Sequence, residues 1–292
     1  MSIWEALVLG IVQGATEFLP VSSSGHLVLL QKIFGITEPA LVFDTAVHVG
    51  TLVAVFIVLW QDIWNILRRI IQPLTLFLII ATIPAVIAAL LFMKPIEAAF
   101  ASGSLLGFSF LLTALLLFGS ELLYRRSEKP GGLPAKLEGS ALPRDKDEMN
   151  WVDALVIGIF QAVAIIPGLS RSGATISAAI GRKINRDFAA RFSFLLSIPA
   201  ILGAVILQLK DFVKAGSAGL AQTGSAVSGG GAGTIGILPI MIGAISAFIV
   251  ALFSIRLALK IVRQHSLNGF AIYTGILGIL VLVDIFGTHF FF

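Results

Sequence analysis

The sequence contains no cysteine among its 292 residues. The absence of thiols excludes a disulfide framework, a thiolate metal site and a catalytic cysteine. Charged residues are also scarce, because Asp, Glu, Lys and Arg make up 12% of the chain, whereas a soluble domain carries about 25%. Hydrophobic residues make up 57%, and the mean hydropathy is +0.99. This composition predicts an integral membrane protein.

The small net charge of +4 indicates membrane topology rather than a nucleic-acid surface, because the charges fall in loops. We therefore expect a lipid bilayer as partner and no nucleic acid. The first residues, Met1-Ser-Ile-Trp-Glu5, include no basic residue, so we expect no cleavable signal peptide.

Six apolar stretches are long enough to cross roughly 30 Å of hydrocarbon. They cover residues 43–60, 74–93, 104–123, 192–209, 235–255 and 268–290. Two other apolar segments, 3–19 and 151–166, run into turns rich in Gly and Ser, and the shorter apolar pieces 27–34 and 176–180 follow. This pattern predicts two re-entrant hairpins, because non-helical backbone at membrane depth must line a polar cavity. The alternative is two ordinary spans per turn, for which the second arms are short.

The chain also matches itself at an offset of 148 residues, which pairs Met1 with Met149 and Gln13 with Gln161. Ser22, Ser24 and Gly25 coincide with Ser170, Ser172 and Gly173, and Ser23 falls on Arg171. So many matches in a short stretch indicate an internal duplication.

One hairpin and three full spans per half make the second half enter from the opposite side. The predicted fold class is therefore an all-α polytopic membrane protein with two inverted-topology repeats, each a re-entrant helical hairpin plus three transmembrane helices. We expect a first repeat at 1–124 with its hairpin at 1–34, a cytoplasmic linker at 125–148, and a second repeat at 149–292 with its hairpin at 149–181 and a disordered Gly-rich loop at 215–233.

Basic residues support this topology, since they gather on one face that should be cytoplasmic. They are Arg68, Arg69, several residues of 125–146 and 256–263, Arg182, Lys183, Arg186 and Arg191. We interpret Arg182, Lys183 and Arg186 as charges that face lipid headgroups. In this topology the two hairpin tips meet near the midplane and both termini are external.

The second turn reads Pro167-Gly-Leu-Ser-Arg-Ser-Gly-Ala-Thr175. Gly168 and Gly173 let backbone N–H groups approach a ligand, and Ser170, Ser172 and Thr175 offer hydroxyl groups, while Arg171 offers a planar fork for phosphate. A guanidinium at membrane depth costs roughly 3 kcal/mol or more. The alternative is a polar turn whose arginine reaches the surface.

The first turn carries a carboxylate, three hydroxyls and an imidazole, at Glu17, Ser22-Ser23-Ser24 and His26. If the tips meet, Arg171 reaches Glu17, Ser23 and His26, the groups that phosphoryl transfer requires. Glu17 could orient His26, or ligate a hard cation with Gln13 as a neutral second ligand. The alternative is that Ser22, Ser23 and Ser24 cap the next helix and Glu17 pairs with a buried cation.

Asp44 and His48 lie four residues apart at the outer end of the first full span. They share a helix face. Two interpretations stay open here, namely ordinary polar residues at the membrane interface and members of a functional site.

The segment from Gln13 to His26, Gln-Gly-Ala-Thr-Glu-Phe-Leu-Pro-Val-Ser-Ser-Ser-Gly-His, resembles the first signature of the bacterial undecaprenyl-diphosphate phosphatases of the bacitracin-resistance (BacA/UppP) type. The segment 167–175 resembles the second signature, Pro-Gly-x-Ser-Arg-Ser-x-x-Thr. The segments 43–51 and 192–199 are also similar to this family, and the resemblance covers essentially the whole chain.

The resemblance implies an enzyme of the bacterial inner membrane that removes the terminal phosphate of undecaprenyl diphosphate, recycles the carrier lipid for cell-wall synthesis and confers bacitracin resistance. It implies a site that opens to the outer face and a divalent cation, Mg²⁺ or Ca²⁺. By motif position, Glu17, Ser23, His26 and Arg171 are catalytic, and Ser22, Ser24, Gly168, Ser170, Ser172, Gly173 and Thr175 bind substrate. Glu17 and Gln13 are the candidate metal ligands, although Gln13 is the less acidic of the family's two options there.

A secondary transporter or flippase for a polyprenyl phosphate or another anion is the alternative, since inverted repeats with broken helices are also a transporter architecture. The set of Ser23, His26 and Glu17 favours the hydrolase, because an anion carrier needs no nucleophile or base. A structural scaffold would leave the midplane charges unexplained. Whether the chain forms a homodimer is left open.

Overall fold

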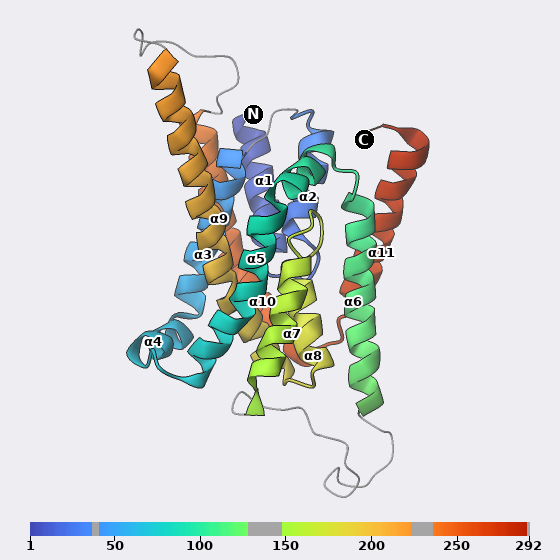
Figure 1. Ribbon diagram of the computed structural model, residues 1–292. Helices are drawn as coiled ribbons and strands as arrows, with labels where there is room; N and C mark the ends of the chain where they lie inside the picture. The colour runs from blue at the N-terminus through green and yellow to red at the C-terminus, as the bar shows by residue number, and fades with distance from the viewer. Residues whose placement is uncertain (37–40, 128–147, 223–235, 291–292) are drawn as a thin grey trace, which may run out of the picture.

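The computed structural model describes residues 1–36, 41–127, 148–222 and 236–290, and the secondary-structure elements in this part of the chain are helices joined by turns. The linker predicted at 125–148 lies largely outside the described residues, since α6 (Leu106–Ser127) ends at 127 and the chain is described again from 148. Figure 1 shows the described helices packed side by side as a bundle, with both termini at the same end.

Five described helices contain a segment that is long and apolar enough to cross a membrane. They are α5 (Pro73–Ser102), α6, α9 (Arg186–Gln222), α10 (Ile237–Gln264) and α11 (Asn268–Val283), the last continued by a π-helical turn, η2 (Asp284–Thr288). A sixth candidate span is a bent pair, α3 (Leu41–Val58) and α4 (Trp60–Arg68), with 76° between its members. These helices correspond to the six stretches that the sequence predicts, with ends that differ by a few residues; residue 235 lies outside the described part.

The bend before α4 has a visible cause in the sequence, where apolar residues give way to an amphipathic segment. Trp60 and Trp64 are exposed and stacked with ring centroids 5.5 Å apart, and the guanidinium of Arg68 lies 4.9 Å from the Trp64 ring. Aromatic and basic side chains of this kind favour the membrane–water interface. The helix axis therefore bends where α4 begins.

Two pairs of short helices form the predicted hairpins. The first pair is α1 (Ile3–Thr16) and α2 (Ser23–Ile33), and the second is α7 (Trp151–Val163) and α8 (Arg171–Gly181). Both first arms begin with a capping box, Ser2 with Glu5 and Asn150 with Asp153. Both second arms begin with a serine whose hydroxyl accepts the N–H of a glycine three residues later.

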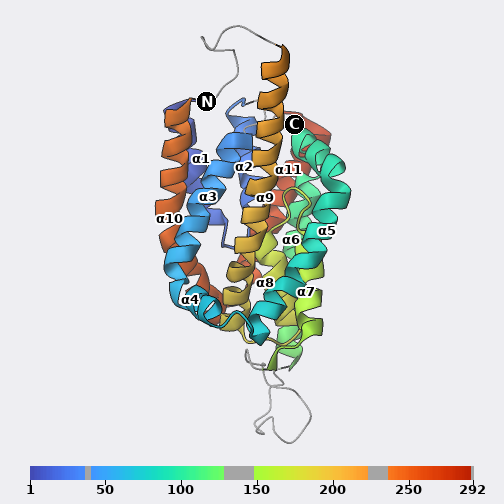
Figure 2. The same ribbon diagram turned by 60° about the vertical axis from the view of Figure 1, so that its left-hand side comes forward.

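The two hairpins enter the bundle from opposite ends. In Figure 1, α1 descends from the end that holds the termini, whereas α7 rises from the other end. Figure 2 gives the same arrangement from a second direction. The tips touch, because the Ser172 hydroxyl donates to the Leu19 carbonyl at 3.0 Å.

Close packing holds both first arms against long helices. A Cβ added at Gly10 in α1 would lie 2.3 Å from the Gly243 carbonyl oxygen of α10, and one at Gly158 in α7 would lie 2.6 Å from the Ala81 carbonyl oxygen of α5. Only a residue without a side chain lets the backbones approach this closely. The short arms are thereby fixed in depth as well as in direction.

Two sequence predictions need correction. Arg182 and Arg186 do not simply face headgroups: Arg182 donates to Asp153 at 2.7 Å, and Arg186, with 13% of its side chain exposed, donates to buried Glu121 at 2.8 Å. Partners this close offset the cost of burying each charge. The loop predicted at 215–233 starts later, because the Ala- and Leu-containing segment up to Gln222 continues α9; residues 223–233 lie outside the described part.

Candidate active site

The first turn follows directly from α1, whose last residue is Thr16. Glu17 comes next and is only 6% exposed. Ser22 has a backbone φ of +73°, a left-handed conformation that is uncommon for residues other than glycine. It ends the turn and starts α2 at Ser23, so the carboxylate and the first hydroxyl of the new helix lie on the same side.

The second turn brings Arg171 to that point. Gly168, with φ of +83°, reverses the chain, and the backbone N–H of Ser170 donates to the Thr113 hydroxyl of α6 at 3.1 Å. Arg171 is the first residue of α8. The amino termini of α2 and α8 therefore both face the junction, and helix amino termini attract anions.

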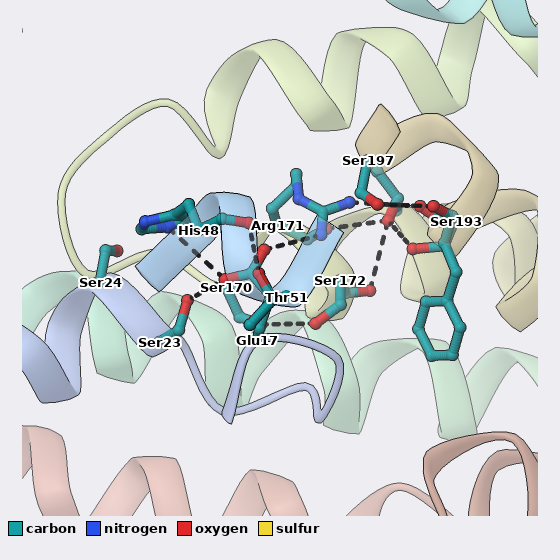
Figure 3. A network of polar contacts seen from close by, with 12 residues as sticks. Glu17, Ser23, Ser24, His48, Thr51, Ser170, Arg171, Ser172, Ser193 and Ser197 are labelled. Carbon is teal, nitrogen blue, oxygen red and sulfur yellow. Dashed lines mark hydrogen bonds and ion pairs between the residues drawn. The ribbon is translucent and has the colours of Figure 1, made fainter. Parts of the chain in front are cut away.

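Glu17 connects these groups (Figure 3). One of its oxygens, Oε1, accepts from Arg171 at 3.1 Å, and the other, Oε2, accepts the Ser23 hydroxyl at 2.5 Å. Gln13, one helical turn earlier, donates its amide to Oε2 at 3.0 Å. Arg171 also donates to the Ser193 carbonyl of α9 at 3.2 Å. The juxtaposition of Glu17, Ser23 and Arg171 that the sequence predicts is thus present.

His26 belongs to the same turn but contacts other partners. Its Nδ1 lies 2.6 Å from the Ser22 carbonyl oxygen, and its Nε2 lies 2.7 Å from the hydroxyl of Tyr273 in α11. The Ser23 hydroxyl is directed to Glu17 instead. In this arrangement the group positioned to take a proton from Ser23 is the Glu17 carboxylate.

The remaining predicted binding residues surround the junction, and several of their hydroxyls hold the turns in shape. Ser22 and Ser170 cap their helices, and Ser24 lies 3.5 Å from the Ser22 hydroxyl. Thr175 lies 2.6 Å from the Ser193 hydroxyl. Gly173 must stay small, because an added Cβ would come within 3.0 Å of Ser170.

His48 of α3 is a further member of the site. Its Nε2 lies 3.7 Å from Glu17 Oε2 (Figure 3). Its Nδ1 lies 2.6 Å from the Asp44 carbonyl oxygen. Asp44 itself accepts from Gln31 of α2 at 2.8 Å. Of the two interpretations left open for His48, its position favours the functional one.

Sequence reasoning missed Tyr273 and Ser193. Ser193 lies in a segment that carries a family resemblance, which is a usable signal, whereas Tyr273 stands alone in an apolar span. One signal for Tyr273 was its rarity, since the chain has only two tyrosines.

The side chains at the junction offer few oxygen atoms that could bind a divalent cation. Glu17 is the carboxylate at the junction, and the Oε1 atom of Gln13 is buried with no hydrogen-bond partner in the described part of the chain. Among the described residues, no three His, Asp or Glu side chains are grouped to hold a metal. Oxygen donors of this kind suit a hard cation, and Mg²⁺ usually takes only one or two protein ligands and completes its shell with phosphates and water.

The sequence is similar to known proteins over nearly its whole length. Residues 6–280 match the family described as bacitracin resistance protein BacA. The chain belongs to this family. It is 42% identical over 283 residues to an undecaprenyl-diphosphatase of Carboxydothermus hydrogenoformans and 39% identical over 283 residues to undecaprenyl-diphosphatase 3 of Bacillus cereus, with 97% of each chain covered. An undecaprenyl-diphosphatase of Halothermothrix orenii is 38% identical over 285 residues, with 97% of this chain and 98% of the relative covered.

Proposed function

We propose that this membrane protein hydrolyses undecaprenyl diphosphate to undecaprenyl phosphate and phosphate. One observation carries the proposal: Arg171 from the second turn and Ser23 from the first are hydrogen-bonded to the two oxygens of the same buried carboxylate, Glu17. The names of the similar BacA-family proteins support the substrate. In cells this reaction recycles the carrier lipid for cell-wall synthesis, which accounts for bacitracin resistance.

The geometry supports a division of roles. An incoming diphosphate competes with Glu17 for Arg171, because phosphate oxygens match the guanidinium fork as well as a carboxylate does. Glu17 then accepts the Ser23 proton as the hydroxyl oxygen bonds to the terminal phosphorus. The bond from that phosphorus to the bridging oxygen breaks, and undecaprenyl phosphate leaves. Water releases phosphate from Ser23 afterwards, and His26 serves the proton transfers of this step.

A divalent cation, Mg²⁺ or Ca²⁺, belongs to the proposal. Glu17 and the Gln13 Oε1 atom, which has no hydrogen-bond partner among the described residues, would hold it together with the substrate phosphates. When bound, such an ion neutralises charge on the phosphate oxygens.

An apolar groove beside the first turn fits the lipid chain. It has a volume of about 480 Å³ and lies between the turn, the end of α10 and the start of α11. Its lining includes Thr16, Leu19 and Val21, which flank the site residues, together with Gly269, Phe270 and Tyr273. The groove therefore continues from the proposed phosphate site.

The inverted repeats and the orientation are part of the same proposal. Capping boxes at both first arms, serine caps at both second arms and the opposite entry of the hairpins support a duplicated, inverted unit (Figure 1). We place the end with the termini outside the inner membrane, and the site opens to that side. Residues 125–148 then face the cytoplasm.

Phosphate release from undecaprenyl diphosphate by the purified protein in detergent tests the function. It is measured with and without EDTA, alongside Arg171→Ala and His26→Ala. The proposal predicts metal-dependent release that both variants lose. A folded wild type that releases no phosphate, yet binds the intact lipid through Arg171, would instead identify a transporter or flippase.

A further inference from the structure

Tyr273 reaches the site from a distant part of the chain. It lies on α11, 247 residues from His26 and outside both signature segments. Its hydroxyl is 2.7 Å from His26 Nε2, and the two rings are nearly parallel, with centroids 5.7 Å apart and planes inclined by 10°. The last long helix thus contacts the histidine of the first turn.

The Ser22 carbonyl fixes where the proton of the neutral His26 ring resides. The Ser22 carbonyl oxygen can only accept, so Nδ1 carries a proton in the neutral ring and Nε2 is the basic nitrogen. The Tyr273 hydroxyl then donates to Nε2. If the ring gains a proton, Nε2–H donates and the tyrosine oxygen accepts. The same hydroxyl therefore suits both protonation states, as a phenol can donate or accept.

The Tyr273 side chain that contacts His26 is not part of the buried core. His26 is 9% exposed, whereas Tyr273 is 47% exposed and lines the apolar groove. Phe110 meets the imidazole edge-on with centroids 5.5 Å apart and offers it only carbon atoms. The tyrosine hydroxyl is consequently the polar contact that keeps Nε2 from facing an apolar wall.

We propose that Tyr273 is a positioning residue, which hydrogen-bonds the basic Nε2 of His26 and holds the ring in one orientation for proton transfer. The proposal rests on the proposed phosphatase function. Tyr273 acts through His26, as an orienting partner does for a catalytic base.

A double-mutant cycle tests this role with undecaprenyl diphosphate. Tyr273→Phe keeps the ring and removes the hydroxyl, so we expect kcat to fall about tenfold with KM nearly unchanged. In a His26→Gln background the same change should cost almost nothing. Tyr124→Phe, the change at the only other tyrosine, is the control, because Tyr124 stacks on Arg186 with 4.4 Å between guanidinium carbon and ring centre and should leave kcat unaffected.

An unchanged or raised kcat in Tyr273→Phe, or an equal loss with and without His26, would overturn the proposal. A second measurement does not need activity. Nitrogen NMR of labelled histidine, with His26 assigned from His26→Gln, should show a protonated Nδ1 in both proteins and an Nε2 resonance that shifts in Tyr273→Phe, where the Nε2 hydrogen bond is lost. An identical spectrum would count against the positioning role, whereas a wild type without phosphatase activity would refute the function alone.

Discussion

Glu17 and Arg171 form a buried ion pair whose partners come from the two halves of the chain. Their side chains are 5% and 16% exposed. Removing two charges from water is expensive, and a close contact offsets that cost only in part. A pair held this way in a membrane protein is better explained by function than by stability. In the proposed mechanism, the pair also keeps the guanidinium in place until a phosphate replaces the carboxylate.

Adjacent serines of the first turn should differ sharply in importance. Ser23→Ala removes the hydroxyl that donates to Glu17 at 2.5 Å, whereas Ser24 contacts only the Ser22 hydroxyl, at 3.5 Å, among the hydrogen bonds of the described residues. We expect phosphate release to fall by about 10³-fold or more in Ser23→Ala and only slightly in Ser24→Ala. Assays at saturating substrate decide this. Comparable rates in the two variants would point to water as the nucleophile.

The sequence predicted part of this site and missed the rest. The contact between Arg171 and Glu17 could be predicted, because two polar turns in an apolar chain are expected to lie together in one cavity. Tyr273 could not be assigned, since a tyrosine in a span is usually an interfacial residue. For His48, a spacing of four from Asp44 shows a shared helix face but not which helix it faces.

The helices α1 and α7 depend on close backbone contacts, which gives a prediction about stability. Gly10→Ala places a Cβ 2.3 Å from a backbone oxygen of α10, where nothing flexible can yield. We expect a loss of about 1–3 kcal/mol in the free energy of unfolding. Gly119→Ala in α6, where an added Cβ meets nothing within 4 Å, should be neutral or slightly stabilising. Thermal melts in one detergent compare the two; an equal Tm would refute the contact.

The groove beside α11 makes a prediction about the lipid chain. Gly269 lines it, and a Cβ there meets nothing within 4 Å, so Gly269→Leu adds an apolar side chain at the groove whose Cβ has room. We expect KM for undecaprenyl diphosphate to rise about tenfold with kcat nearly constant, the effect of losing a hydrophobic subsite. Gly203→Leu also projects into open space, on α9, and serves as control. The same KM in both variants would place the chain elsewhere.

The apolar stretches of the sequence predicted which segments form long helices better than they predicted where those helices begin and end. Continuous hydropathy located the long helices, whereas the turn into α4 depends on the packing of two tryptophans and an arginine at the interface. The extension of α9 to Gln222 shows the same limit, because Gly and Ser near a helix end lower its stability without fixing where it stops.

The whole molecule has its polar junction between two hairpins that enter from opposite ends (Figure 2). The repeat offset predicted a duplicated unit, and the opposite entry of the hairpins is consistent with an inverted one. Which end faces outward stays a prediction, because charge bias is its only basis.

Labelling can test that orientation cleanly, since the chain has no cysteine of its own. Ser2→Cys and His265→Cys place single thiols at exposed positions. Ser2 precedes α1 and His265 follows α10, and the start of α1 and the end of α10 lie at opposite ends of the bundle (Figure 1). A membrane-impermeant maleimide should label Ser2→Cys in intact cells and His265→Cys only after permeabilisation. The reverse pattern would invert the proposed topology.

The most direct test of the catalytic junction compares two buried glutamates. Glu17→Gln removes the carboxylate that joins Ser23 and Arg171, whereas Glu121→Gln breaks a similar buried pair with Arg186, outside the junction. Phosphate release per folded protein should fall by about 10²-fold or more in Glu17→Gln, the size of a general base contribution, and stay near wild type in Glu121→Gln. Equal rates in the two variants would contradict a catalytic role for the carboxylate that links the two halves.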